Sequence, residues 1–470
     1  MCDVKPMSND DANGGYIRTS GQRYPVVGGE CKSDQQFLAE GMETEASEML
    51  EAATHDGSFG ERKQISAEGE AERKTHTLIP SKTKGRKRAF SLLDTLISLS
   101  IVGPLAIGFW RGIWTWMDLH ADLFPDWFCF ASGVFLHVIF AFYQDRCHDV
   151  YMDEWTKSSA LGRLPYRALR ILYTYVFGVA CNAHWRGCWI IISDYYLMHI
   201  WITTCLMCLL LACLAILRCV RNLIAPPLLI FIDTPAHVFQ FPTRYNANTR
   251  DWSLYLLDCA FSVGVVGTLV VFVWRGVWIL FDLYLFPENP GYSAVGSLAI
   301  GYSIVAVTFC LQPLMRYVCA RLQGLVRLVV ADAFLLLSFL GTVNVWRGIW
   351  IALDLWLLPD NPELSCWITH IGCFVFLVLL NCSNSILVRG VYIDAEEEEG
   401  KCVVFPCHYL RLFFKIEREK KEARRQKLLV ASRDFDGHVD VNGKDSDNGT
   451  LLPNNTTVTI IPMSADSSVA

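Results

Sequence analysis

The stretch TLVVFVWRGVWILFDLYLFPENP, residues 268–290, contains the features that decide the fold. An apolar run leads into Trp274-Arg275-Gly276-Val277-Trp278, Asp282 follows eight residues after the first Trp, and a Pro-Glu-Asn-Pro turn ends the segment. Apolar runs of this kind supply the roughly 20 residues that a helix needs to cross the hydrocarbon core of a bilayer. In a helix, the Arg and the Asp lie about two turns apart and project from nearly the same side.

The Trp-Arg-Gly-x-Trp pattern occurs four times, and an Asp follows each copy. The copies are Trp110, Arg111, Gly112, Trp114 and Asp118; Trp185, Arg186, Gly187, Trp189 and Asp194; Trp274, Arg275, Gly276, Trp278 and Asp282; and Trp346, Arg347, Gly348, Trp350 and Asp354. Copies one and three are 164 residues apart, and copies two and four are 161 apart. This periodicity indicates a duplicated module in which each half has two hairpins of two spans. In the second copy the Asp lies one position later than in the others.

The bulk composition agrees with a membrane protein, because 52% of the 470 residues are hydrophobic and only 19% are charged. The apolar blocks run from about Phe90 to Ile393, with polar sequence on both sides. We therefore predict an all-α, polytopic transmembrane helical bundle with about eight spans, built from four hairpin repeats in two similar halves. The expected spans lie at about 91–112, 126–144, 166–186, 195–217, 252–274, 292–315, 326–346 and 366–388.

The distribution of Lys and Arg predicts the orientation. The flank before the first span and the loops after the even-numbered spans are basic, whereas the alternate loops carry Asp and Glu. Because basic loops stay on the cytosolic side, both termini are expected in the cytosol and all four motifs at the outer ends of their helices.

Four regions follow from this reading. Residues 1–88 are expected to form a disordered cytosolic tail, and residues 89–394 the eight-helix transmembrane domain, with repeat halves at about 89–230 and 250–394. Residues 395–430 contain an acidic run and a basic amphipathic helix, which would either bind the inner leaflet or a calmodulin-type partner, or remain a solvated charged helix. Residues 431–470 are expected to be a second disordered tail.

Two interpretations of the motif remain open. The Trp and Arg residues would anchor and pack helix ends at the outer headgroups, or the four units would together form a shared site, with Arg and Asp of different copies in contact. The motif glycine would let another helix approach closely. Asp258 and Asp332 are candidate intramembrane acids, because a charge at membrane depth is costly and faces the bundle interior; Arg170, Arg316 and Arg327 are their candidate partners.

The sequence gives no sign of an enzyme. It has no paired His cluster, no Ser/His set, no metal-ligand spacing and no phosphate loop, so we expect no catalytic residue, no metal and no cofactor. The modest net charge of −6 does not predict nucleic-acid binding. Cys205 and Cys208 form a CxxC, but they lie inside an apolar run and are expected to act as small hydrophobic residues.

The repeated Trp-Arg-Gly-x-Trp…Asp units, the eight expected spans and the long polar tails resemble the Fuseless family over roughly residues 90–395. The resemblance implies a multi-pass protein of the plasma membrane at presynaptic terminals, where it would support calcium-channel organisation at active zones and evoked transmitter release. It implies voltage-gated calcium channels or active-zone proteins as partners besides the lipid bilayer, and it carries over no catalytic residue. The alternative is a transporter or channel that uses the Arg/Asp units, and the oligomeric state stays open.

Overall fold

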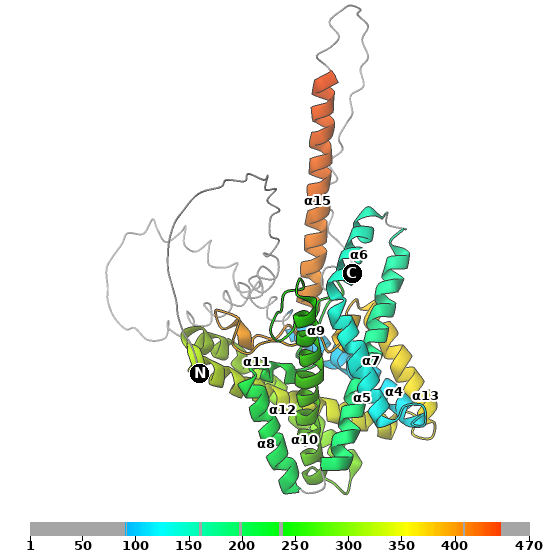
Figure 1. Cartoon of the computed structure of the whole chain (residues 1–470), viewed down its shortest axis with the longest axis vertical. Coiled ribbons are helices and arrows are strands. Elements are labelled where there is room, and N and C mark those ends of the chain that lie inside the picture. Colours follow the sequence, from blue (N-terminus) through cyan, green and yellow to red (C-terminus); the bar gives the residue numbers. More distant parts are fainter. Residues whose placement is uncertain are drawn as a thin grey trace, which may run out of the picture. The chain divides into compact units, whose positions relative to one another are not determined.

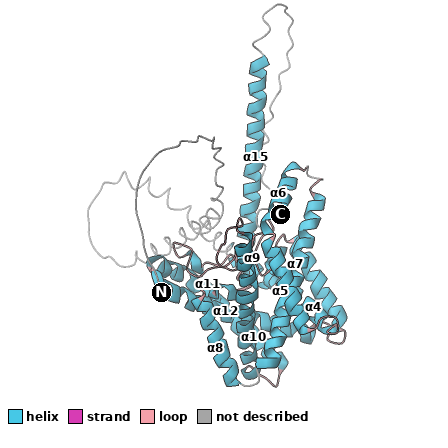
Figure 2. Ribbon diagram, viewed as in Figure 1, coloured by secondary structure: helices cyan, strands magenta, loops and turns pink. Residues whose placement is uncertain are grey.

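The computed structural model describes residue 90 and residues 92–158, 162–196, 200–234, 238–407 and 409–442 (Figure 1). This part of the chain is built from helices and loops, without strands (Figure 2). The predicted disordered tails, 1–88 and 431–470, lie outside the described residues, except that the last helix continues as far as Asn442. The chain divides into two units, Met1–Cys407 and His408–Ala470.

In the described part of the first unit, the α-helices form eight segments. In the first half they are Leu92–Leu119, which contains the π-turn η1 (Ser98–Val102) and α4 (Gly103–Leu119); α5 (Asp126–Phe142) with α6 (Gln144–Lys157); α7 (Leu164–Tyr196); and α8 (Ile200–Ile216). In the second half they are Trp252–Tyr284, which contains α9 (Trp252–Phe261), η3 (Ser262–Gly267) and α10 (Thr268–Tyr284); α11 (Pro290–Arg321); α12 (Gly324–Trp356); and Pro362–Leu379, which contains α13 (Pro362–Trp367), η4 (Ile368–Gly372) and α14 (Cys373–Leu379). The π-turns η1 and η3 lie at equivalent places in the two halves, which agrees with the duplication.

Five helices of the described chain are long and apolar enough to cross a membrane: Leu92–Leu119, Trp252–Tyr284, Pro290–Arg321, Gly324–Trp356 and Pro362–Leu379. A sixth crossing results if α5 and α6, which meet at a 53° bend, form one span. Helix α8 is apolar but has only 17 residues. The structure therefore gives fewer clear spans than the eight expected, although the helical segments fall at the eight expected places.

The helices pair differently from the expected hairpins. Helix α5 packs against α7, α8 against α10, and α11 against α12, so each motif helix packs on the helix that precedes it in the chain. The first motif helix, α4, packs instead against the last pair, α13 and α14. The last helix of each half therefore packs against the first helix of the other half. As a result, the two halves do not form separate bodies.

Two loops also interlock the halves. Residues 217–233 and 380–394 each begin with a residue in the left-handed region, Arg218 (φ 54°) and Asn381 (φ 58°). A short 3₁₀ helix follows in each loop, η2 (Val220–Leu223) and η5 (Ser383–Ile386).

An aspartate near the end of each loop binds the 3₁₀ helix of the other loop. Asp233 accepts hydrogen bonds from the amides of Ser383 (3.0 Å) and Asn384 (2.8 Å) and from both of their side chains. Asp394 accepts from the amides of Val220 (2.7 Å) and Arg221 (2.8 Å). Free N–H groups at a helix start are satisfied by such carboxylates, and here the donor and the acceptor come from opposite halves.

The second unit contains one long helix, α15 (Tyr409–Asn442). Its exposed surface is rich in charge, with ion pairs such as Lys420 to Glu417 at 2.7 Å. The helix begins where the basic amphipathic stretch was expected, near residue 408, and extends past its expected end at residue 430.

Candidate functional site

The four motifs come together at one end of the first unit, where their tryptophans form two closed rings. In the first ring, Trp110 contacts Trp185 and Trp346, and Trp274 contacts the same two residues, with ring centroids 5.4–5.8 Å apart. All four contacts are edge-to-face, an arrangement that the aromatic quadrupole favours. The copies thus follow one another around an axis in the order of the chain, so the four units form a ring rather than a row.

The second ring lies one helical turn farther along the motif helices. Trp114 contacts Trp189 and Trp350, and Trp278 contacts the same two residues, at centroid distances of 5.3–6.1 Å. These contacts are also edge-to-face. Four indoles in mutual contact leave no space for a hydrated ion on the axis, so two aromatic layers close it.

The indole N–H groups of the first ring tie it to the two loops. Trp110 donates to the Ile386 carbonyl (2.8 Å), Trp274 to the Leu223 carbonyl (3.1 Å) and Trp346 to the Pro226 carbonyl (2.6 Å). Buried indoles generally find such acceptors, and these come from the loops of both halves.

Arginine and aspartate of different copies are in contact. Arg186 donates to Asp118 at 2.7 Å, Arg111 to Asp354 at 2.9 Å, and Arg347 to Asp282 at 2.9 Å. Arg186 and Arg347 each bind the Asp of the preceding copy, and Arg111 of the first copy binds the Asp of the last copy, so the series closes on itself. The three guanidinium groups are buried, whereas the carboxylates are about half exposed. A buried charge of this kind depends on its partners.

The packing partner of each motif helix completes the coordination of these three arginines. Arg111 also donates to Ser365 Oγ (2.7 Å), and Arg347 donates to Ser297 Oγ (2.5 Å) and Ser293 Oγ (2.7 Å). Arg186 donates to Cys129 Sγ of α5 at 3.4 Å and to the Phe124 carbonyl, just before α5, at 3.0 Å. The guanidinium fork thereby links two motif helices and one packing helix at each of the three positions.

The fourth position in the ring is different. Arg275 donates to Ser193 Oγ at 2.8 Å, and its nearest carboxylate is its own Asp282 at 3.6 Å. Ser193 stands eight residues after Trp185, where the other copies carry their Asp, and the displaced Asp194 is exposed. Arg275 also lies over the Trp189 ring, 5.1 Å from its centroid. The displacement in the second copy therefore removes one acid from the ring.

The motif glycines lie where the motif helix crosses its packing partner. A Cβ on Gly112 would stand 2.5 Å from the His370 backbone nitrogen, and one on Gly348 would stand 2.7 Å from Leu298 Cγ. Gly187 faces the Phe130 backbone equally closely. Gly276 faces only the flexible Met207 side chain, at 3.1 Å. At three crossings only glycine fits. The fourth crossing, at Gly276, is looser, and it belongs to the third copy, which also contains the exceptional Arg275.

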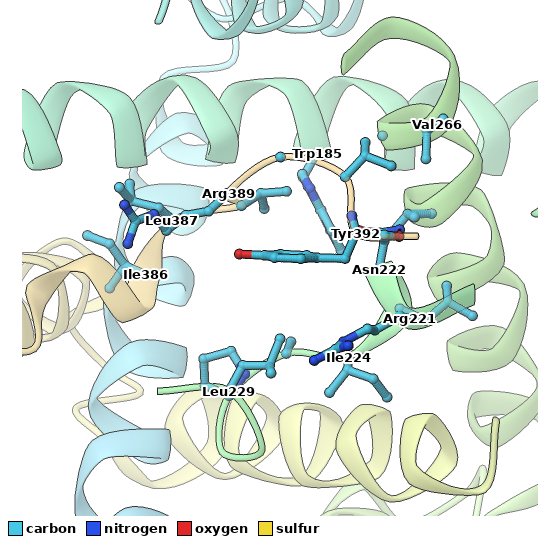
Figure 3. Close-up of a pocket in the computed structure, with 18 of the residues that line it drawn as sticks. Trp185, Arg221, Asn222, Ile224, Leu229, Val266, Ile386, Leu387, Arg389 and Tyr392 are labelled. Carbon is cyan, nitrogen blue, oxygen red and sulfur yellow. Dashed lines mark hydrogen bonds between the residues drawn. The ribbon is translucent and has the colours of Figure 1, made fainter. Parts of the chain in front are cut away.

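A cavity of about 100 Å³ lies beneath the first tryptophan ring, and all four of its tryptophans belong to the lining. Figure 3 shows the cavity, with Trp185 labelled among these residues. Most of the remaining lining is apolar and comes from the two interlocked loops, η3 and α10. The Tyr392 ring occupies the middle of the view between Trp185 and Arg221, whose Cζ is 5.8 Å from the Tyr392 centroid. Residue Asn222 joins the loops by accepting from Tyr392 N and donating to Tyr392 O.

Several ionisable groups of the loops are buried near this cavity. Arg221 pairs with Glu397 at 3.1 Å. Burial raises the pKa of Asp394 above its ordinary value, although the Arg221 and Val220 amides act in the opposite direction. Burial lowers the pKa of Arg389, whose guanidinium donates to the Val238 carbonyl at 3.0 Å.

The two candidate intramembrane acids do not pair with the expected arginines. Asp258 is buried, but it accepts from Thr243 Oγ1 (2.7 Å) and from the amides of Tyr245 and Ala247. Asp332 is partly buried, and its Oδ1 has no hydrogen-bond partner among the described residues. These acids therefore do not form the buried ion pairs that were expected.

Some residues of the site were not identified from the sequence. Asp233 and Asp394 end the matching segments Phe231-Ile232-Asp233 and Tyr392-Ile393-Asp394, so their repetition 161 residues apart was a usable signal. His137 gives no such signal, because it is a single histidine in an apolar run. Within the described ranges, no group of three or more His, Cys, Asp or Glu residues is arranged to hold a metal ion.

A search with protein-family models matches residues 89–387 to the Fuseless family. Comparisons with curated proteins and with solved structures give no match.

Proposed function

Because the chain belongs to the Fuseless family, we propose that it is a multi-pass membrane protein of presynaptic terminals that organises other membrane proteins there. By analogy with the family, its task is to support calcium-channel placement at active zones and thereby evoked transmitter release. Voltage-gated calcium channels and active-zone proteins are the proposed partners. The closed double ring of tryptophans is the observation that favours an organising role over a transport role.

We place all eight helical segments across the bilayer. Three motif helices belong to the segments that are long and apolar enough to span, and the tryptophans of α7 contact those of two of them, α4 and α10, in both rings. Since all four motifs lie near the C-terminal ends of their helices, these helices run in parallel and need return helices between them. An exposed aromatic residue near the start of each packing helix supports this placement, as expected for a membrane interface. These residues are Trp127, Trp201, Tyr292 and Trp367.

The rings argue against conduction along the axis. A pathway there would have to separate indoles that are in mutual contact and would expose arginines that are buried in ion pairs. Removing the partner of a buried charge costs about 3–5 kcal/mol. A transporter or channel that uses the Arg/Asp units remains the alternative, and it requires this ring to open during each cycle.

The organising role is tested in neurons from which the chain has been removed. The measurements are calcium-channel density at active zones and evoked release. The parent chain and an Asp122→Asn variant, which changes an exposed acid of an outer loop, should both restore the two quantities. An Arg186→Ala/Arg347→Ala variant, which breaks two ring positions, should restore neither. Equal channel density with and without the parent chain would contradict the proposal.

The alternative is tested by reconstituting the purified full chain into proteoliposomes. We expect no conductance and no solute uptake above that of empty liposomes. A conductance that changes in an Arg275→Ala variant would favour the transport function over the organising one.

A further inference from the structure

The cavity beneath the first tryptophan ring contains a buried hydrogen-bond acceptor. His137 of α5 lines the cavity and is only 2% exposed. Its Nε2 lies 3.2 Å from the Val388 carbonyl oxygen. A carbonyl only accepts hydrogen bonds, so Nε2 carries the proton and Nδ1 is an acceptor. This Nδ1 is buried and has no partner in the described part of the chain.

A second histidine nitrogen lies near the same wall. The rings of His137 and His184 are 6.0 Å apart, and His184 Nδ1 is also buried without a partner among the residues described. Gly267, which lines the cavity, has no side chain to cover it: a Cβ there would lie 3.2 Å from His184 Cε1. Buried polar atoms are nearly always hydrogen-bonded, so the unpartnered Nδ1 of His137, a lining residue of the cavity, points to a ligand with a donor group.

The charges around the cavity determine which kind of ligand fits. Two guanidinium groups, those of Arg221 and Arg389, belong to the lining and disfavour a cation. Arg221 is neutralised by Glu397, and Arg389 donates to a backbone carbonyl and lies 5.3 Å from the Phe231 ring centroid. The remaining wall is largely apolar. An uncharged molecule with an apolar body and one donor therefore matches the lining.

We propose that this cavity binds a small uncharged alcohol of the phenol or short alkanol class. Its hydroxyl group donates to His137 Nδ1, and its apolar body lies against the four indoles. The volume of about 100 Å³ is smaller than, but of the same order as, that of a cavity of about 150 Å³ that accepts benzene, so a single substituted ring sets the upper limit on the size of the ligand. The site is separate from the Arg/Asp ring and does not depend on the organising function. A bound molecule would contact both loops and all four motif helices, so it would stabilise the closed ring.

The test uses the full chain in detergent micelles and 3-bromophenol, whose heavy atom quenches tryptophan fluorescence. Bromobenzene is the matched ligand without a donor. We expect saturable quenching of part of the emission of the 15 tryptophans, reversed by unbrominated phenol. Since a buried hydrogen bond contributes about 1 kcal/mol, 3-bromophenol should bind roughly fivefold more tightly than bromobenzene.

Two variants locate the site. His137→Phe keeps a ring without the acceptor, and it should weaken 3-bromophenol about fivefold while leaving bromobenzene nearly unchanged. Val266→Phe fills the cavity from a buried lining position and should remove the saturable quenching of both ligands. If Val266→Phe fails to fold, the affinities of the two ligands for the parent chain and for His137→Phe still test the proposal.

Three results would overturn the proposal. Quenching that rises linearly and is not reversed by phenol would mean that the ligand only partitions into the micelle. Equal affinities of the two ligands for the parent would mean that His137 binds water rather than a ligand donor. Saturable quenching unchanged in folded Val266→Phe would place the site elsewhere.

Discussion

Arg275 donates to Ser193 Oγ at 2.8 Å, at the ring position where the other three arginines each meet an aspartate of the preceding copy. The acid that the sequence provides, Asp194, lies one residue beyond this position and is exposed. The ring of four equivalent units therefore has one neutral junction, between the second and third copies.

Moving the acid by one residue should strengthen this junction. In a Ser193→Asp/Asp194→Ser variant, Arg275 gains the carboxylate that its three counterparts already have, so we expect the free energy of unfolding to rise by about 1–2 kcal/mol. The measurement is thermal unfolding of the detergent-solubilised chain. Ser193→Asn/Asp194→Ser is the control with similar volume and no charge, and it should show no gain. Equal stability of the two variants would mean that Arg275 does not need a carboxylate.

The four arginines should differ in their importance for stability. Arg347→Ala removes a buried guanidinium that donates to Asp282 at 2.9 Å and to Ser293 and Ser297, so it should cost about 3 kcal/mol. Arg275→Ala removes a more exposed group with a weaker ion pair and should cost about 1 kcal/mol. Unfolding in denaturant gives both values, and a larger loss for Arg275→Ala would be inconsistent with the neutral junction.

The motif glycines provide a matched pair of substitutions. Gly112→Ala places a methyl group against the His370 backbone, which cannot move without separating α4 from η4. We expect a loss of about 2–3 kcal/mol or failure to fold. Gly276→Ala meets only the Met207 side chain, which can turn aside, and should be tolerated within about 1 kcal/mol. Expression level and melting temperature measure both. Equal effects would show that the close crossing is not required.

Asp233 and Asp394 each bind the loop of the other half, so substituting either one should affect residues that lie far away in the sequence. Asp233→Asn replaces an oxygen that accepts hydrogen bonds with an NH₂ group, so the amides of Ser383 and Asn384 should exchange hydrogen faster, by roughly tenfold or more. Asp394→Asn should do the same to the amides of Val220 and Arg221. Hydrogen exchange with mass spectrometry measures both effects. Faster exchange confined to the mutated loop would contradict the crossed arrangement.

The proposed orientation is tested with inserted glycosylation acceptors. A reporter placed after Pro359 should be modified, because it follows the end of α12 that carries the tryptophan rings. A reporter placed within 220–245 should remain unmodified, since this region is on the side where Lys and Arg are concentrated. Replacing the acceptor Asn with Gln is the control. Modification at the second position instead of the first would reverse the orientation.

The repeated units could be identified from the sequence, because their signals are local. The fixed offset between Arg and Asp made contacts between copies one of two open interpretations, and the later position of Asp194 marked the irregular unit. Whether the units form a ring or a row was not predicted. The glycine predicted a close helix crossing, which the backbone around Gly112 bears out.

The remaining features depend on contacts that periodicity does not encode. Nothing in the spacing indicates that α4 packs against α13 and α14, since consecutive spans were expected to pair. Asp258 was expected to meet an arginine, but a loop that folds back supplies Thr243 and two amides at lower desolvation cost. Whether a loop turns back into a bundle depends on the whole packing rather than on its own residues.

The pairing of the first motif helix with the last helices has a consequence for biosynthesis. Arg111 enters the translocon long before the ribosome has made Asp354, which lies 243 residues later. At synthesis rates of about 5–20 residues per second, the nascent chain holds an unmatched guanidinium for roughly 12–50 s. A chain truncated before residue 354 therefore leaves Arg111 permanently without the carboxylate that it binds in the complete ring.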